Sequence, residues 1–268
     1  ISPGVLAREN DQSQITAGPI QAGAAIIGPT VKGQVEIPTL CTSYSDYVSK
    51  FGNTFTSGSE EYSYFTSISA YNYFQNGGTS LLVTRVANGT FTSATSSFIS
   101  SSLADDVPVF ELETLAQGTI NNSLDGTYVA AGNASNTGSN GTLLSGSKDN
   151  LRWEITNPNT SSGVFSLVIR RGDDSSKKKT VLETFTNVSL DPKASNYIAR
   201  QIGDMTKTLA GSGTDVYLQS TGSYTNASKY VRVKTVHLKT PDYLNNDGTA
   251  KAKFTSSIPI AASGGFAS

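Results

Sequence analysis

The chain has 268 residues, more than a typical domain of about 100–150, so its length allows one large domain or two smaller ones. Only 15% of its residues are charged and its net charge is −1, which leaves no electrostatic basis for binding nucleic acid or an anionic membrane. The single cysteine, Cys41, excludes an internal disulfide and a cysteine-rich metal site, and no apolar run approaches the roughly 18 residues of a membrane-spanning helix.

The first segment, residues 1–19, is polar and has few apolar side chains. It is either a disordered terminus or an arm that becomes ordered on a neighbouring molecule. The apolar run over residues 24–27, closed by Gly28 and Pro29, predicts a buried strand that enters a turn. Residues 35–38 form a second short extended segment that ends at a proline.

Two helix signals follow. Ser43 is a candidate N-cap with Asp46 three residues later, and apolar residues recur at helical spacing before Gly52, namely Tyr44, Tyr47, Val48 and Phe51. Ser57 and Glu60 form a second capping pair, and the expected buried stripe of that helix is Tyr64, Phe65, Ile68 and Tyr71. A mostly apolar strand over residues 81–86 comes next, so the order strand, helix, helix, strand predicts a small α/β core layer.

Beyond residue 86 the sequence is rich in strand and loop signals. The Ser/Thr-rich residues 88–102 are either a linker or a weak edge strand. Strands are expected at 107–112, 126–130, 151–155, 165–169 and 181–188, with a surface loop over 132–150 and a hairpin turn at 172–174. A helix that opens at Asp191-Pro192 places Ile198, Ile202 and Met205 on one face.

The last part of the chain predicts two more strands. Val216 and Leu218 are the expected inward residues of the first, and a change in the apolar face near Lys234 indicates a β-bulge in the second, over 230–238. The chain stops after Gly264-Gly265 with no closing core element, so we expect a fragment of a longer protein. Together the elements predict an α+β fold, in which a small α/β core layer carries a large β-rich insertion domain.

Candidate catalytic residues are few. The one histidine, His237, lies in a predicted strand, and no Gly-x-Ser-x-Gly motif supplies the nucleophile of a triad. One histidine and one cysteine cannot make a zinc site, and no glycine-rich phosphate loop is present. The adjacent acids Asp105-Asp106 and Asp173-Asp174 are typical of solvated turns. We therefore expect no enzyme, no metal and no cofactor.

Three short motifs have structural explanations. The tripeptide Arg171-Gly172-Asp173 coincides with the exit of a strand into a turn, although it also matches an integrin-recognition sequence. The Asn-x-Ser/Thr triplets arise by chance in a chain this rich in these residues, and nothing indicates a secretory route. Residues 177–179 are three lysines, which suit a hairpin tip better than a nucleic-acid patch.

Several motifs together carry a family resemblance. The first are Ser2-Pro3-Gly4-Val5, then Ala25-Ile26-Ile27-Gly28-Pro29 with Gly33, and then Tyr47-Val48 with Phe51-Gly52. They continue with Phe74, Asn76-Gly77-Gly78, residues 82–86, residues 185–192 with Tyr197-Ile198, and Gly264-Gly265. Their order and spacing resemble tail sheath proteins of contractile-tailed bacteriophages, over residues 1–86 and 153–205.

The resemblance implies a structural virion protein of the phage tail, made in the bacterial cytoplasm. Copies of such a subunit form hexameric rings around the tail tube protein, meet the baseplate, and contract to drive the tube through the host envelope. An inter-subunit arm would include Ser2, Pro3, Gly4, Val5 and Leu6 and would add a strand to a neighbour's sheet. The implied domains are the arm 1–20, a core sheath domain 21–87, a β-rich outer insertion 88–257 and a return segment 258–268, and family members continue into a carboxyl-terminal domain.

Two other classes of function stay open. A β-rich receptor- or carbohydrate-binding module would use Trp153 and exposed tyrosines as stacking platforms, although Trp153 shares its face with Leu151 and Ile155, which should be buried. A hydrolase is the third possibility. Assembly of a longer chain into rings or tubes, seen by electron microscopy, would favour the sheath, and glycan binding by a monomer would favour the module.

Overall fold

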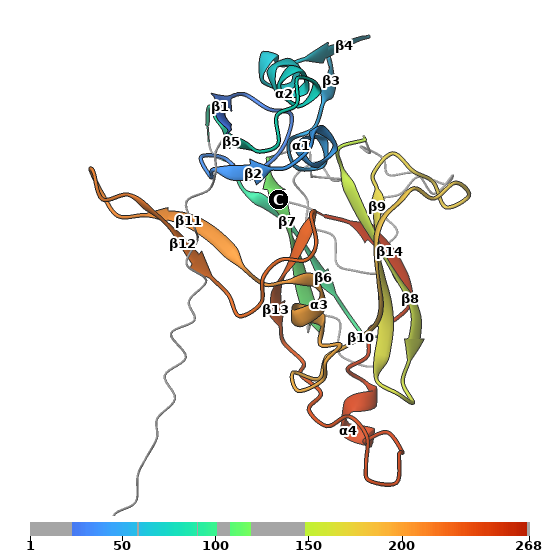
Figure 1. The fold of residues 1–268 in the computed structure, drawn as a ribbon. Coiled ribbons are helices and arrows are strands. Elements are labelled where there is room, and N and C mark those ends of the chain that lie inside the picture. The colour runs from blue at the N-terminus through green and yellow to red at the C-terminus, as the bar shows by residue number, and fades with distance from the viewer. Residues whose placement is uncertain (1–22, 58, 90, 101–107, 119–147, 267–268) are drawn as a thin grey trace, which may run out of the picture.

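The computed structural model describes residues 23–266 except 58, 90, 101–107 and 119–147 (Figure 1). The arm residues Ser2, Pro3, Gly4, Val5 and Leu6 therefore lie outside the described residues, as do Asp105-Asp106 and the strand expected at 126–130. The described chain is mostly β-sheet with a few short helices, which is a mixed α+β class as expected. None of its helices is long and apolar enough to cross a membrane.

Residues 23–86 form a compact group, which we call the α/β unit, built on a three-stranded sheet. Strand β5 (Leu81–Arg85) lies in the centre, with β1 (Ala24–Gly28) parallel on one side and β2 (Thr39–Cys41) antiparallel on the other. Helices α1 (Tyr44–Phe51) and α2 (Phe65–Gln75) cover one face, and the hairpin β3 (Thr54–Ser57) and β4 (Glu60–Ser63) separates them. The buried core of the unit contains Cys41, Tyr47, Phe51, Ala70, Leu81 and Val83.

The sequence signals for α1 are confirmed. The hydroxyl of Ser43 accepts a hydrogen bond from the Asp46 amide at 3.1 Å, which caps the helix as its spacing predicts. Gly52 ends the helix with a positive φ of 75°, and its amide donates to the Val48 carbonyl. Tyr47 and Phe51 are the buried residues of the helix, so its expected apolar face does face the sheet.

The expectations for α2 are wrong in two respects. Ser57 and Glu60 do not cap a helix, because they belong to the β3–β4 hairpin, and α2 begins only at Phe65. Of the expected buried stripe, Phe65 is 85% exposed, and Ile68 and Tyr71 are also exposed. The face that packs inward consists of Thr66, Ser67 and Ala70. These small residues let the helix approach β1 so closely that a Cβ on Gly28 would lie 2.6 Å from the Thr66 hydroxyl.

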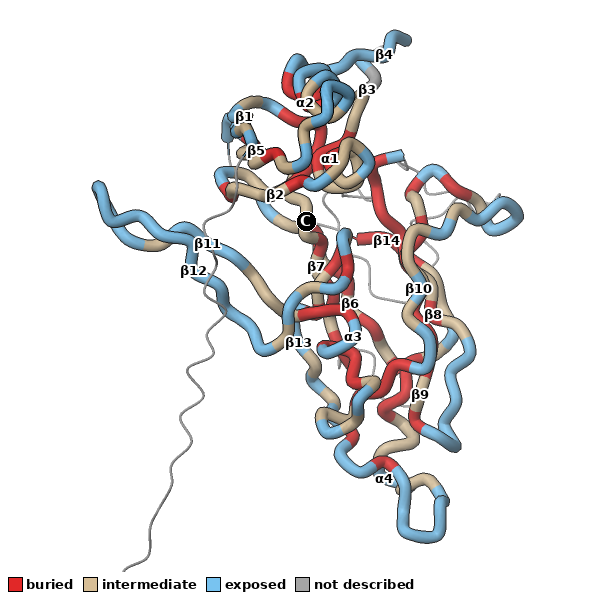
Figure 2. Tube along the Cα trace, viewed as in Figure 1, coloured by how far each residue is buried: buried red, intermediate tan, exposed pale blue. Residues whose placement is uncertain are grey.

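The rest of the described chain, which we call the β-rich part, is built on two facing sheets. The larger has the order β10-β9-β8-β14, from β10 (Val181–Ser189), β9 (Val164–Arg171), β8 (Leu151–Asn159) and β14 (Ala262–Gly265). The smaller has the order β13-β7-β6, from β13 (Val231–Val236), β7 (Phe110–Gln117) and β6 (Ser93–Phe98). Figure 2 shows buried segments of the two sheets facing each other across the core.

Stacked aromatic side chains join the two sheets. The ring centroids of Phe98 and Phe110, on β6 and β7, are 4.3 Å apart. Phe98 also lies 4.4 Å from Trp153 on β8, and Phe110 lies 5.6 Å from Phe165 on β9. Aromatic pairs at these distances stabilise a core beyond the area that they bury. The centre of the β-rich part is therefore one continuous apolar cluster.

Several strand predictions in this part are confirmed. Strands occur over the expected 151–155, 165–169 and 181–188, and β9 and β10 form the expected hairpin. The Ser/Thr-rich segment supplies the edge strand β6. Strand β13 changes register between Val233 and Thr235, which places the bulge at Lys234.

Other expectations for this part are wrong. The helix α3 (Ile198–Ile202) begins seven residues after Asp191 and ends before Met205. Val216 and Leu218 do not point inward, because β11 (Thr206–Ala210) and β12 (Tyr217–Thr221) form an exposed hairpin that projects from the body (Figures 1 and 2). A fourth helix, α4 (Ala252–Thr255), was not expected. The apolar run at 24–27 does form a strand, but Ile27 is exposed.

The expected extended segment at 35–38 is also displaced. Val35 makes a single isolated bridge to Arg85, and the strand itself starts after Pro38. The end of the described chain differs as well from the expected return of residues 258–268 to the core unit. Strand β14 pairs antiparallel with β8, so Gly264 lies opposite Trp153 in the larger sheet.

Candidate functional site

Of the residues considered for catalysis, those in the described part of the chain do not come together in a catalytic group. The His237 Nε2 atom lies 3.1 Å from Glu111 Oε1 on the surface of the β-rich part, and 36% of the His237 side chain is exposed. Among the described residues, no three His, Cys, Asp or Glu side chains are close enough to hold a metal ion. This geometry supplies a surface ion pair when the imidazole is protonated.

Trp153 is unavailable as a stacking platform for a sugar. Its side chain is 1% exposed and lies on the buried face with Leu151 and Ile155, as the strand pattern predicts. The indole Nε1 donates to the Ser96 hydroxyl at 2.8 Å and to the Gly265 carbonyl at 3.1 Å. A Cβ on Gly264 would lie 2.7 Å from the indole ring, which explains a glycine at that position.

Asp174 is not a solvated turn residue, which corrects the expectation for the Asp173-Asp174 pair. It is 4% exposed, and its carboxylate accepts hydrogen bonds from Arg170 Nε at 2.7 Å and Arg170 Nη2 at 2.9 Å. Arg152 Nη1 lies 3.3 Å from the same carboxylate, and the Thr180 amide donates to it at 2.8 Å. Burial lowers the pKa of the Arg152 guanidinium. The group joins β8 and β9 to the hairpin turn and is structural in character.

Several motif residues meet where the α/β unit joins the β-rich part, at a place that we call the junction. Arg85, at the end of β5, is buried, and its Nη1 donates to the Gly33 carbonyl at 2.7 Å and to the Gln117 carbonyl at 2.9 Å. The Gln117 amide donates to the Gly33 carbonyl, and its side-chain Oε1 accepts from the Val35 amide at 2.9 Å. The ends of β5 and β7 are thus both fastened to the loop at residues 33–35.

The glycine at position 33 is required by its surroundings. Its φ is 112°, a conformation that side chains with a Cβ rarely adopt. A Cβ there would lie 2.7 Å from the Phe51 ring, which is itself buried. Gly33 and Phe51, which belong to two different motifs, therefore pack against each other.

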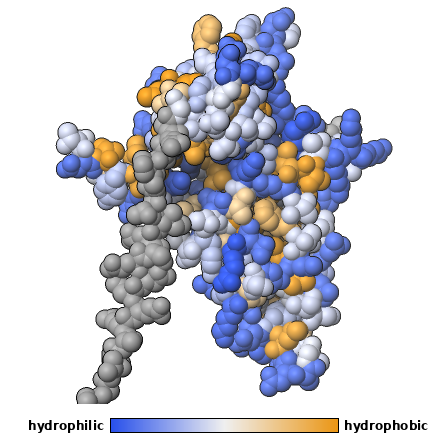
Figure 3. Space-filling model, in the orientation of Figure 1, coloured by the Kyte–Doolittle hydropathy of each residue, from blue (hydrophilic) through white to orange (hydrophobic). Residues whose placement is uncertain are grey.

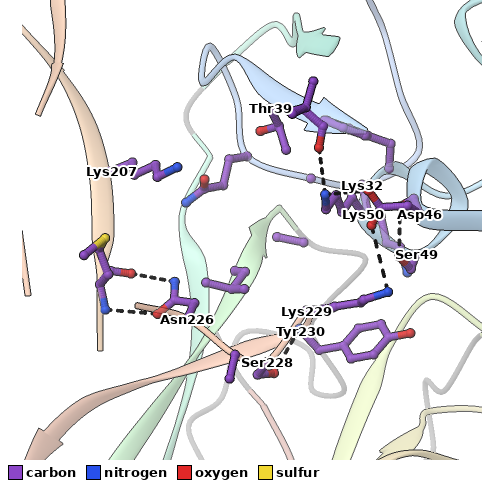
Figure 4. A pocket seen from close by; sticks show the side chains of 18 of the residues that line it. Lys32, Thr39, Asp46, Ser49, Lys50, Lys207, Asn226, Ser228, Lys229 and Tyr230 are labelled. Carbon is purple, nitrogen blue, oxygen red and sulfur yellow. Dashed lines mark hydrogen bonds and ion pairs between the residues drawn. The ribbon is translucent and has the colours of Figure 1, made fainter. Parts of the chain in front are cut away.

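A pocket of about 540 Å³ lies beside the junction, between the two parts of the chain (Figure 4). The α/β unit contributes Leu40, Phe51 and two lysines, Lys32 and Lys50. The β-rich part contributes Lys207 and Lys229 together with apolar residues, which include Leu115, Ala116, Leu151 and Met205. The pocket thus combines apolar walls with four lysine side chains. We call it the lysine pocket.

Two of these lysines are neutralised by carboxylates. Lys32 Nζ lies 3.8 Å from Asp149 Oδ1 and 5.8 Å from the centre of the Tyr230 ring. Burial lowers the pKa of the Lys32 ammonium and raises the pKa of the Asp149 carboxyl, because the charged form of each loses hydration. Lys50 Nζ donates to Asp46 Oδ2 and to the Leu40 carbonyl, each at 2.8 Å.

The other two lysines are less compensated. Lys229 Nζ lies 3.9 Å from Asp46 Oδ1, so it shares this carboxylate with Lys50 (Figure 4). Lys207, on β11, is exposed, lines the pocket, and has no ion pair with another described residue. A third carboxylate, that of Glu183, accepts a hydrogen bond from the Lys229 amide at 2.8 Å. The four ammonium groups therefore have three carboxylates near them, and the excess of positive charge lies at Lys207.

The sequence did not predict this pocket. Its lysines stand at positions 32, 50, 207 and 229, each without a local motif, and only the tertiary fold brings them together. Of the motifs that suggested a family, Gly33, Phe51 and Arg85 act instead on packing and hydrogen bonding at the junction.

A second candidate surface is the uncovered side of the α/β unit, which we call the open sheet face. It carries Ala25, Ile27, Leu82 and Thr84, whose neighbours in sequence point toward the helices. Ile27 is 74% exposed and Ala25 is exposed, while Leu82 and Thr84 are half-buried. In Figure 3 apolar surface gathers where the α/β unit holds β1 and β5.

Comparisons with known proteins complete the description. No protein-family model and no curated protein matches the chain. Among solved structures, the chain is similar to a sheath tail protein from Listeria innocua at 9% identity and a TM-score of 0.39, over 92% of this chain and 34% of that one. It is similar to a sheath tail protein from Desulfitobacterium hafniense at 10% identity and a TM-score of 0.27, over 87% and 39% respectively.

TM-scores this low do not define a shared fold. The chain spans between about a third and two-fifths of the length of these two solved chains.

Proposed function

We propose that this chain is part of a structural subunit of a contractile phage tail sheath. In this proposal, copies of the subunit form hexameric rings around a tail tube, meet a baseplate, and contract to drive the tube through the host envelope. The proposed division of labour is an arm at 1–20, a core unit at 21–87 and a β-rich outer part over 88–257. The proposal includes no catalytic step.

The open sheet face is the observation that carries this proposal. Strands β1 and β5 form the parallel pair of a mixed sheet, and parallel strands in α/β folds are typically buried under polypeptide on both faces. Here α1 and α2 cover one face, while the other leaves Ile27 largely in solvent. Such a sheet is expected to be covered by further polypeptide, which suits a subunit that works by association.

The sequence motifs give independent support. Gly33, Phe51-Gly52 and Arg85 belong to motifs that resemble sheath proteins, and they meet at the junction. Position 33 requires a glycine because the Phe51 ring lies against it, and position 85 requires an arginine to donate the two hydrogen bonds at the junction. A protein that must rotate as a rigid body in an assembly would benefit from two parts fastened in this way.

The test is assembly of a longer version that includes the carboxyl-terminal domain expected for the family. Negative-stain electron microscopy should show rings or tubes with a regular repeat. Ile27→Asp should abolish them, because a charge would be buried when the open sheet face is covered. Val181→Asp is a matched control, since Val181 is also an exposed aliphatic residue on a strand but lies in the β-rich part. A longer chain that stays monomeric at all concentrations tested would overturn the proposal.

A further inference from the structure

The lysine pocket has the features of a binding site that the sheath proposal does not use. Its volume of about 540 Å³ falls within the roughly 300–1,000 Å³ of pockets that bind small ligands or short segments. It lies between two parts of one chain, a common position for such pockets. Its apolar walls would stabilise a ligand by burying apolar surface, and its lysine ammonium groups would favour a negatively charged ligand.

The polar groups of the pocket define which charge is selected. Asn226 is already engaged, because its Oδ1 accepts from the Met205 amide at 3.0 Å and its Nδ2 donates to the Met205 carbonyl at 2.7 Å. These two bonds fix the chain just before β11 and so position Lys207, which points into the pocket (Figure 4). Lys50 is also engaged with Asp46 and Leu40. Of the charged groups that line the pocket, the ammonium groups of Lys207 and Lys229 are therefore the least engaged, and the uncharged side chains of Gln34 and Thr225 lie in the same lining.

We infer that the lysine pocket binds an acidic peptide segment, with one or two carboxylates at Lys207 and Lys229 and apolar side chains against Leu40, Leu115 and Met205. Two ammonium groups without full compensation favour carboxylates on the ligand, and the apolar walls favour side chains over a free inorganic anion. The chain's net charge of −1 gives no wider basic surface for nucleic acid. The inference does not rest on the sheath proposal and would hold for a protein of another class.

The inference is tested by fluorescence anisotropy on the unsubstituted chain of 268 residues. The probe is a labelled peptide that alternates glutamate with leucine, compared with the same peptide carrying glutamine in place of glutamate. The glutamate peptide should bind at least roughly tenfold more tightly, since an ammonium forms a stronger hydrogen bond with a carboxylate than with a neutral amide. Its affinity should fall as salt is raised, because part of the pocket is open to solvent.

The double variant Lys207→Gln, Lys229→Gln should bring the two peptides to the same affinity. The matched control is Lys177→Gln, Lys178→Gln, because these lysines are equally exposed but lie on the hairpin turn of the larger sheet. This control should leave binding unchanged. Circular dichroism checks that each variant is folded, which is expected because all four lysines are at the surface.

Charge reversal gives a second readout. Lys229→Glu should weaken binding of the glutamate peptide. It should strengthen binding of a peptide in which lysine replaces each glutamate. Equal binding of the glutamate and glutamine peptides by the unchanged chain would overturn the inference. So would competition by inorganic phosphate at concentrations near the peptide's own dissociation constant, because the site would then accept a free anion. Neither result would bear on ring or tube formation, so failure of the peptide-binding inference would leave the sheath proposal untested and unchanged.

Discussion

Arg85 donates a hydrogen bond from its Nη1 atom to the carbonyl oxygen of Gln117, 2.9 Å away, and so joins the last residue of β5 to the last residue of β7. The same nitrogen also bonds to the Gly33 carbonyl. One buried guanidinium thus bridges the α/β unit and the β-rich part. Burial lowers its pKa, but a guanidinium remains charged at any physiological pH.

Replacement of Arg85 should therefore destabilise the whole chain. We expect Arg85→Ala to lower the free energy of unfolding by about 2–4 kcal/mol, because the buried Gly33 carbonyl and the partly buried Gln117 carbonyl each lose a charge-assisted hydrogen bond. Urea denaturation followed by circular dichroism measures this loss. Arg171→Ala is the control, since the Arg171 side chain forms a surface ion pair with Asp173, and its loss should change stability by less than about 1 kcal/mol. Equal effects of the two changes would show that Arg85 does not fasten the junction.

A comparison of two glycines tests the packing of the α/β unit. Gly33 and Gly77 both have a positive φ, of 112° and 85°, but a Cβ on Gly33 would strike the Phe51 ring, whereas a Cβ on Gly77 would meet nothing within 4 Å. Gly77→Ala should cost about 1–2 kcal/mol from backbone strain alone. Gly33→Ala should cost at least about 1 kcal/mol more, because a buried ring must move. Thermal unfolding of both variants checks the order, and a reversed order would contradict the contact.

The buried carboxylate of Asp174 offers a third test. Asp174→Ala leaves Arg152 and Arg170 buried without their common partner, so we expect a loss of about 3–5 kcal/mol. The adjacent Asp173→Ala removes only a partly exposed pair with Arg171 and should stay within about 1 kcal/mol of the unchanged chain. Denaturant midpoints for the two variants distinguish the buried group from the surface pair. Similar midpoints would return Asp174 to the role of an ordinary turn residue.

Cys41 should react slowly with thiol reagents in the folded chain. Burial raises the pKa of its thiol from 9.0 to about 11, so at pH 8 the thiolate is about a hundredfold rarer than in an unfolded chain. A colour-forming disulfide reagent should therefore label Cys41 fast only in denaturant. The folded state holds the thiol proton more tightly than the unfolded state does. The free energy of unfolding should therefore fall as pH rises from about 9 to 11. Fast labelling in native buffer would mean that β2 opens readily.

The elements predicted correctly from the sequence are those with complete local signals. Helix α1 has its cap at Ser43, its apolar face and its glycine stop within ten residues. The bulge at Lys234 is visible as a change in the apolar face of one strand. Such features depend on near neighbours in the chain, and tertiary packing does not reverse them.

The failures come from contacts made far away in the chain. Helix α2 turns small residues such as Thr66 inward because β1 approaches closely at Gly28, and hydrophobicity alone favoured Phe65 and Ile68 instead. Asp174 is buried because Arg152, from another strand, reaches it. The lysine pocket depends on residues nearly two hundred positions apart, such as Lys32 and Lys229, and has no local pattern at all.

The position of Trp153 decides what an optical experiment on this chain reports. It is the only tryptophan in the sequence, and it lies between the two sheets of the β-rich part with its indole bonded to Ser96. Its emission therefore follows the separation of these sheets, while the tyrosine cluster of Tyr44, Tyr47 and Tyr71 belongs to the α/β unit. Tyrosines also occur in the β-rich part, so only selective excitation of the tryptophan reports on one part alone. A difference between its denaturant midpoint and the midpoint from circular dichroism of the whole chain therefore measures how tightly the junction couples the two parts.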